Sequence, residues 1–200
     1  MTISLSRRML LLQSASGVAL ALSAPAAFAV SLDVARDLVD RLVADVNAVI
    51  ASGKSESGML QDFETIFNTY ADVPSIAANV LGNARREASR EQITAFIGAF
   101  RTYIARKYGR RFREFIGGRV EVRQARDVPN GVEVETSAVF VGRAPFRVDF
   151  VVSDGSGQPL FFNIIIEGIN MILSERTEIL AMLDQRGGDF DALIAALPQG

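Results

Sequence analysis

The spacing of hydrophobic positions along this chain changes character near its middle. In the first half, apolar side chains recur every three or four residues, which is the period of an amphipathic helix. The pattern predicts helices over 33–51, 56–70, 74–81 and from Ser89 to about Ile116. The last of these helices carries an aromatic stripe that includes Phe96, Phe100, Tyr103, Tyr108, Phe112 and Phe115.

Beyond Gly118 the hydrophobic period falls to two. Alternating apolar and polar residues, separated by short turns, predict strands over 119–123, 132–140, 146–150 and 160–167. Such alternation is typical of an antiparallel sheet with one buried face and one wet face. We expect the buried face to carry Val120, Val122, Val132, Val134, Phe140, Phe146, Val148, Phe150, Phe162, Ile164 and Ile166.

Two further helices, over about 169–185 and 190–197, close the chain. Helices, a run of strands and helices again predict an α+β fold with a four-stranded antiparallel sheet.

The first 29 residues have the layout of a secretory signal peptide. Arg7 and Arg8 follow a short start, and a moderately apolar run leads to Ala27-Phe28-Ala29, which fits a small-x-small cleavage site. The paired arginines favour twin-arginine export over the general route. Polar residues interrupt the apolar run, so it falls short of a membrane span. We therefore expect cleavage after Ala29, a periplasmic product and one domain over 30–200.

The composition excludes most kinds of catalytic site. The chain has no His and no Cys, which excludes Ser-His-Asp and Cys-His nucleophile systems, histidine metal ligands and thiolate zinc sites. Only Lys54 and Lys107 could act as a lysine base. We therefore predict a binding protein with no enzymatic activity, no metal and no cofactor.

Several short phrases beyond residue 80 carry a further signal. In order, they are Val80-Leu81-Gly82, Arg86, Ala88-Ser89 with Gln92, Ile166-Glu167-Gly168-Ile169-Asn170, Arg176 and Gly188-Asp189 with Asp191. Together they resemble the MlaC or toluene-tolerance family of periplasmic phospholipid-binding proteins. The chain departs from the family's usual residues at Arg85, Pro159, Asn163 and Glu175.

The resemblance implies a cone-like sheet wrapped by helices, similar to the nuclear-transport-factor architecture, with a deep apolar cavity for acyl chains. It also implies a soluble, monomeric carrier of glycerophospholipid. Such a carrier would exchange lipid between an inner-membrane ABC transporter with its MCE-type complex and an outer-membrane lipoprotein complex, and so maintain outer-membrane lipid asymmetry. We expect the lipid to contact Phe96, Phe100, Tyr103, Phe140, Phe146, Val148, Phe150, Phe162 and Ile164.

Residues 101–126 hold nine basic and two acidic side chains. Segregated charge of this kind steers encounters with acidic partners or anionic headgroups, so we expect docking through Arg110, Arg111 and Arg113 during transient approach to a membrane. A nucleic-acid partner does not fit an exported protein. Two alternatives remain open: a periplasmic adaptor with a filled core and no ligand, or an isomerase- or hydratase-type enzyme with Tyr103 or Asp149 as its acid or base.

Overall fold

The computed structural model of the chain describes residues 30–109 and 116–197. Within them the elements follow in the order α1 (Leu32–Ala51), α2 (Glu56–Tyr70), α3 (Val73–Leu81), the 3₁₀ helix η1 (Gly82–Arg86), α4 (Arg90–Gly109), β1 (Arg119–Val128), β2 (Gly131–Val139), β3 (Phe146–Ser153), β4 (Leu160–Ile166), β5 (Ile169–Asn170), α5 (Met171–Asp184) and α6 (Phe190–Ala196). The predicted α+β class is confirmed. The expected leader and the three expected docking arginines, Arg110, Arg111 and Arg113, lie outside the described residues.

The helices begin where the sequence supplies N-terminal caps. The side chains of Ser31, Ser55 and Asp72 each accept a bond from a backbone N–H in the first turn of α1, α2 and α3. Before α4, the Ser89 hydroxyl accepts from the N–H of Gln92 at 3.1 Å, while the Ser89 N–H donates to the Gln92 side chain at 3.0 Å. These bonds satisfy N–H groups that have no partner inside the helix.

The sheet is antiparallel, and its order β1-β2-β3-β4-β5 follows the sequence. The prediction of four strands, with a helix from Ile169, was wrong. Glu167 and Gly168 both have positive φ, and this tight turn brings Ile169 and Asn170 back to pair with Ile166 and Ile165. The short fifth strand delays the start of the helix to Met171. The expected helix up to Ile116 is also corrected, because Ile116 lies in a turn.

Two register shifts alter the predicted strands. The first, between Val122 and Ala125, lets β1 continue to Val128 instead of ending at residue 123. The second lies at Phe162: Val151 pairs with Asn163, but Val152 pairs with Phe161. A bulge of this kind changes which residues face each side of a strand. As a result Phe161 is buried and Phe162 is only half-buried.

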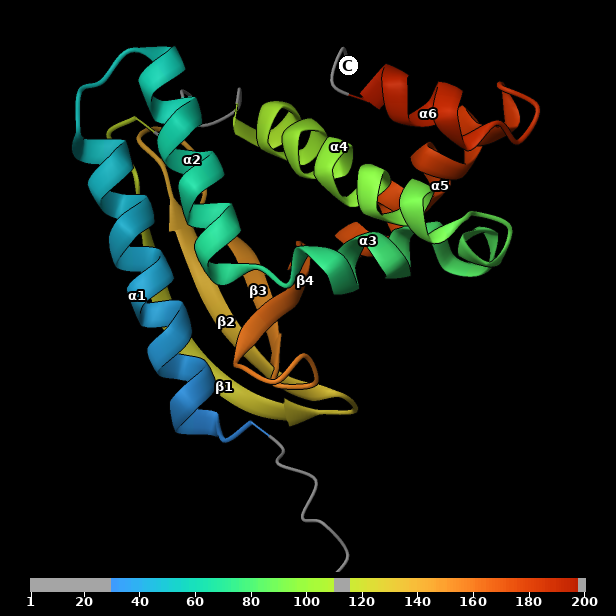
Figure 1. Cartoon of the computed structure of the whole chain (residues 1–200). Coiled ribbons are helices and arrows are strands. Elements are labelled where there is room, and N and C mark those ends of the chain that lie inside the picture. Colours follow the sequence, from blue (N-terminus) through green and yellow to red (C-terminus); the bar gives the residue numbers. More distant parts are fainter. Residues whose placement is uncertain (1–29, 110–115, 198–200) are drawn as a thin grey trace, which may run out of the picture.

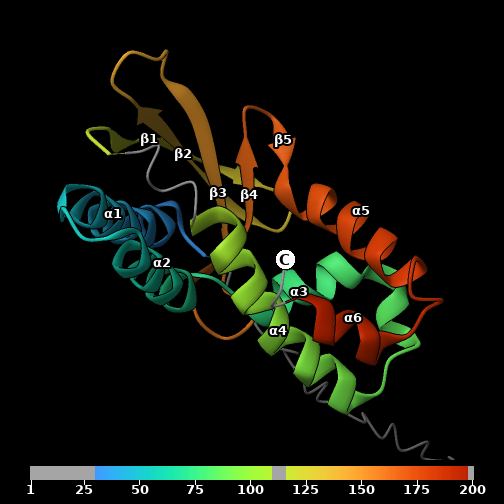
Figure 2. The same cartoon turned by 90° about the horizontal axis from the view of Figure 1, so that it is seen from above.

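The helices form two groups around the sheet (Figures 1 and 2). α1 packs along β1 and β2, and α2 lies between α1 and α4. α3 and α5 pack against each other and against β4, while α4 packs against α2, α3 and α6. Both views show the C-terminal end of α4 directed toward the sheet and its N-terminal end directed away from it. No helix in the described parts of the chain combines the length and apolarity needed to cross a membrane.

Candidate functional site

The face of the sheet that packs on α1, here called the inner face, has a sealed end near the β1–β2 and β3–β4 hairpins. Register and strand alternation place Val132, Val152 and Phe161 in one row of this face and Val134 in the next. All four side chains are buried. Phe161 meets the Phe67 ring of α2 at 6.2 Å and the Phe150 ring edge-on at 5.5 Å. This end is ordinary filled core.

The opposite end of the inner face is half-open. Its large apolar side chains Phe140, Phe146, Val148, Ile164 and Ile166 are all only half-buried, although the small side chains of Thr136 and Ala138 on the same face are buried. Phe140 and Phe146 stack on each other with ring centroids 5.1 Å apart. Val148 pairs with Ile166, and Phe150 pairs with Ile164, so this group forms a continuous apolar floor. It contains most of the sheet residues that the sequence predicts to contact lipid.

Exposed apolar side chains surround this half-open end. Of the six large hydrophobic residues that are exposed in the described chain, four lie in or beside the loops at this edge of the sheet: Ile116 (57%), Val141 (79%), Ile169 (60%) and Leu173 (54%). Gly117 lies beside Val141, and Ile169 pairs with Ile166. Apolar side chains gathered at one place on a surface mark an interaction site more often than scattered ones do.

The predicted lipid-contacting residues of α4 have a different environment. Phe96 and Phe100 are fully buried and stack at 5.5 Å, and Tyr103 is buried beside Phe100. Their helix packs mainly against α2, α3 and α6 and does not lie flat across the sheet (Figure 2). In this structure these side chains are packed core. Phe150 is buried as well, whereas Phe162 and Ile164 are half-buried.

A polar cluster joins α4 to α5. The Lys107 ammonium donates to Glu175 at 2.9 Å, to Glu178 at 2.5 Å and to the Tyr103 hydroxyl at 3.0 Å. The Tyr103 hydroxyl donates to Glu178 at 2.6 Å, and the Tyr108 hydroxyl donates to Glu175. Glu175 is only 4% exposed, so Lys107 supplies the opposite charge that a buried carboxylate requires.

The pKa values in this cluster shift with its bonding. Burial would lower the pKa of Lys107, but bonds to Glu178, Glu175 and Tyr103 outweigh it and raise that pKa above its ordinary value. Burial opposes the charged form of Glu178 as well and would raise its pKa. The bonds from Lys107 and Tyr103 outweigh burial and hold the pKa of Glu178 below its ordinary value. The pKa of Tyr103 is raised, first by burial and then by its bond to Glu178. At neutral pH Lys107 and Glu178 are therefore charged and Tyr103 is neutral.

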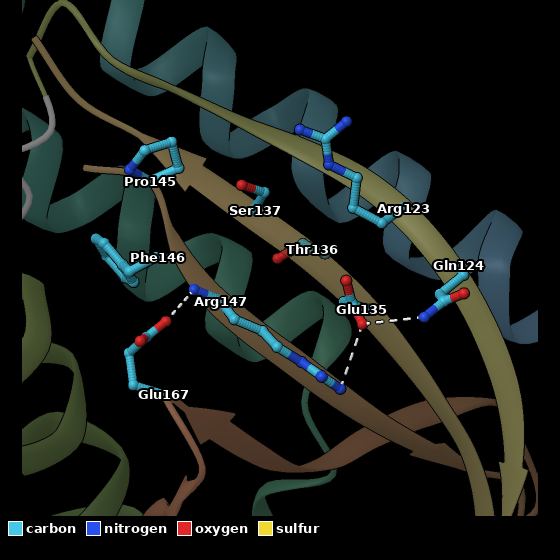
Figure 3. A pocket seen from close by; sticks show the side chains of 9 residues that line it. All are labelled: Arg123, Gln124, Glu135, Thr136, Ser137, Pro145, Phe146, Arg147 and Glu167. Atoms are coloured by element: carbon cyan, nitrogen blue, oxygen red, sulfur yellow. Dashed lines mark hydrogen bonds and ion pairs between the residues drawn. The ribbon is translucent and has the colours of Figure 1, made fainter. Parts of the chain in front are cut away.

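The outer face of the sheet carries an ion-pair network instead of apolar side chains. The Arg147 guanidinium contacts Asp149 at 2.8 Å, Glu133 at 3.2 Å and Glu135 at 3.3 Å. Asp149 falls on the predicted wet face but is buried; burial raises its pKa, although the Arg147 bond opposes this. Figure 3 shows Arg147, Glu135 and Gln124 beside a hollow of about 590 Å³. Apart from Pro145 and Phe146 its lining residues are polar, so this hollow differs from the apolar cavity expected for acyl chains.

The polar cluster was not predicted from the sequence, although one residue could have indicated it. Lys107 lies within the aromatic stripe of a helix, and it is one of two lysines in the chain. A lysine at a position that faces the core requires a carboxylate partner. That partner, Glu175, is 68 residues away in sequence, and no local pattern identifies it.

These features define a small α+β protein in which helices pack on a curved antiparallel sheet whose inner face is apolar and open at one end. The chain belongs to the MlaC protein family, whose model matches residues 36–199. Among solved structures, it is similar to a phospholipid-binding protein from Ralstonia solanacearum in complex with a phospholipid, with 20% sequence identity and a TM-score of 0.70. The match covers 82% of this chain and 95% of the other. The suspected family is confirmed, and the likeness to the solved structure supports the fold.

Proposed function

We propose that this protein binds a glycerophospholipid and carries it through the periplasm. Membership of the MlaC family and the half-open apolar face together support this function. The phospholipid bound to the R. solanacearum protein of similar fold adds to that support. In the proposed complex the acyl chains enter at Phe140, Phe146, Val148, Ile164 and Ile166 and extend toward Phe150, Phe162 and Tyr103. Phe96 and Phe100 would meet the chains only if the helices part. The cavity so formed would correspond to the inside of the expected cone.

The energetics suit a carrier. Burying a methylene group is worth about 0.8 kcal/mol, so two acyl tails of about 30 methylenes are worth roughly 25 kcal/mol when removed from water. A bilayer offers the tails a similar free energy. Transfer between membrane and protein is then nearly balanced, while release into water is strongly unfavourable. Such transfer needs an apolar site and no reacting group.

The route we propose follows from the leader and the family. Export across the inner membrane and cleavage after Ala29 would release a monomer into the periplasm. There it would exchange phospholipid with an inner-membrane ABC transporter carrying an MCE-type subunit and with an outer-membrane lipoprotein complex. Arg110, Arg111 and Arg113 remain the proposed docking residues for acidic partners or anionic headgroups.

The test is the lipid content of the purified mature chain. Protein exported in a bacterial host and shown to be folded by circular dichroism is extracted with organic solvent, and the extract is analysed by mass spectrometry. We expect stoichiometric phospholipid, together with an N-terminus at Val30. Folded protein that carries no phospholipid and takes up none from vesicles would contradict the proposal and favour a ligand-free adaptor.

A further inference from the structure

The interface between α4 and α5 differs from the other helix interfaces of the molecule. α4 packs against α2, α3 and α6, and α5 packs against α3, α6 and β4. Between α4 and α5 themselves, the described hydrogen bonds and ion pairs come from long side chains: Tyr103, Lys107 and Tyr108 on α4, and Glu175 and Glu178 on α5. These five residues therefore supply the direct polar link between two helices that share α3 and α6 as neighbours, while only α4 packs on α2 and only α5 packs on β4.

Each of the five side chains forms a hydrogen bond or ion pair with another member of the group. Lys107 donates to three different partners, and both glutamates accept from Lys107 and from one tyrosine. The ammonium also lies 5.3 Å and 5.7 Å from the ring centroids of Tyr103 and Tyr108. Buried ion pairs add little net stability compared with apolar packing, and their best-attested role is in specificity or switching. An interface made in this way is held in one arrangement but separates more easily than an apolar one.

The group lies next to the half-open end of the inner face. At the start of α5, the Ile172 N–H approaches the Asn163 side chain of β4 at 3.4 Å, and Glu175 follows within one turn. The exposed side chains of Ile169 and Leu173 precede Glu175 on the same connection. From the other side, the C-terminal end of α4, which carries Lys107, is directed toward the sheet (Figures 1 and 2).

We propose that Tyr103, Lys107, Tyr108, Glu175 and Glu178 form a latch between α4 and α5, which is closed in this structure and must open for acyl chains to enter or leave. This inference rests on the proposed carrier function and adds a gate to it. When the latch is closed, the apolar interior is shielded from water; when it is open, α4 and α5 separate beside the half-open face. Gating by movement of packed helices is a common way to control access to a site.

The first test loosens the latch at its exposed side. Glu178→Ala removes the acceptor for Tyr103 and Lys107 but leaves the buried Glu175 paired. We expect the transfer of a fluorescent phospholipid from the protein to phosphatidylethanolamine and phosphatidylglycerol vesicles to be about tenfold faster, equivalent to about 1.4 kcal/mol. Asp62→Ala is the matched control, because it removes an ion pair of similar geometry, Lys54 to Asp62 at 2.6 Å, that includes no residue of α4 or α5. It should leave the rate unchanged.

The second test locks the helices together. The natural chain has no Cys, so Tyr103→Cys with Glu178→Cys gives one defined pair for a cleavable bismaleimide reagent. Before reaction, this variant should transfer lipid quickly. Crosslinking should stop transfer, and reductive cleavage of the reagent should restore it. The same reagent on Lys54→Cys with Asp62→Cys should have no effect.

The outcomes separate the latch from the carrier function. If the wild type exchanges phospholipid but Glu178→Ala transfers it no faster, or the crosslinked pair still transfers it, the latch is wrong and the carrier function stands. If the wild type neither holds nor exchanges phospholipid, the proposed function itself fails.

Discussion

The two ends of the inner sheet face are built from the same kinds of residue but have different environments. At the sealed end, Val132, Val134, Val152 and Phe161 are buried in the core cluster with residues of α1 and α2. At the half-open end, Phe146, Val148 and Ile166 are equally apolar but only half-buried. The difference lies in what covers each end, not in the strands. An apolar strand face therefore becomes a ligand-binding surface when the neighbouring helices leave it partly uncovered.

The largest difference in folding free energy between the two ends should come from placing a charge at each of them. Val134→Glu would bury an unpaired carboxylate in filled core and cost several kcal/mol of folding free energy. Val148→Glu can reach water, so we expect its folding free energy to fall by only about 1 kcal/mol, while bound phospholipid is lost. Urea unfolding and lipid extraction of both variants measure the two effects. If Val148→Glu unfolds the protein as readily as Val134→Glu does, both ends are core.

Truncating one aromatic residue at each end should give a smaller difference in folding free energy. Phe161→Ala should cost about 3–5 kcal/mol, because it leaves a cavity beside Phe67 and Phe150. Phe146→Ala loses its stack on Phe140 but starts half-exposed, so about 1 kcal/mol is expected. Equilibrium unfolding of lipid-free protein provides both values. Equal costs would remove the distinction between the ends.

A still smaller effect concerns the acid sensitivity of the latch. The folded-state pKa of Glu178 lies below its ordinary value, so its contribution to stability is present above the unfolded pKa of about 4.3 and is lost as pH falls through the lower folded pKa. Glu178→Gln should therefore destabilise the protein at neutral pH and make little difference in strong acid. Unfolding at both pH values checks this, and a variant effect that is independent of pH would argue against the bonds to Glu178.

Asp149 should make the free energy of unfolding depend on pH in the opposite direction from Glu178. Its pKa is raised by burial, so protonation favours the folded state, and Asp149→Asn should reduce the gain in stability as pH falls toward the ordinary Asp range. The opposite pH dependence of stability in the two variants distinguishes the contribution of the latch from that of the outer-face network.

Local rules account for most of what the sequence predicted correctly. The Ser89 and Gln92 pair marked the start of α4, and alternation marked the four main strands, because caps and strand periodicity depend on residues close together in the chain. The errors also have local causes. The bulge at Phe162 changed which side chains of β4 face inward, and the turn at Glu167-Gly168 added a strand where helix was expected.

The candidate site was harder to predict because burial depends on residues far apart in sequence. Phe96 and Val148 carry the same apolar signal, yet Phe96 is fully buried and Val148 is half-buried. Lys107 looked like part of a helical stripe, and only its distant partners Glu175 and Glu178 show what it does. Periodicity identifies an apolar face but does not identify what covers it.

The most direct test of this account is to map where a bound lipid lies. A phospholipid with a photoreactive group in its acyl chain is loaded from vesicles and irradiated, and the labelled peptides are identified by mass spectrometry. We expect labelling at residues 140–150 and 162–166, which carry the half-open apolar floor. Labelling at the sealed end, around Val132 and Val134, with none at the half-open end would contradict it.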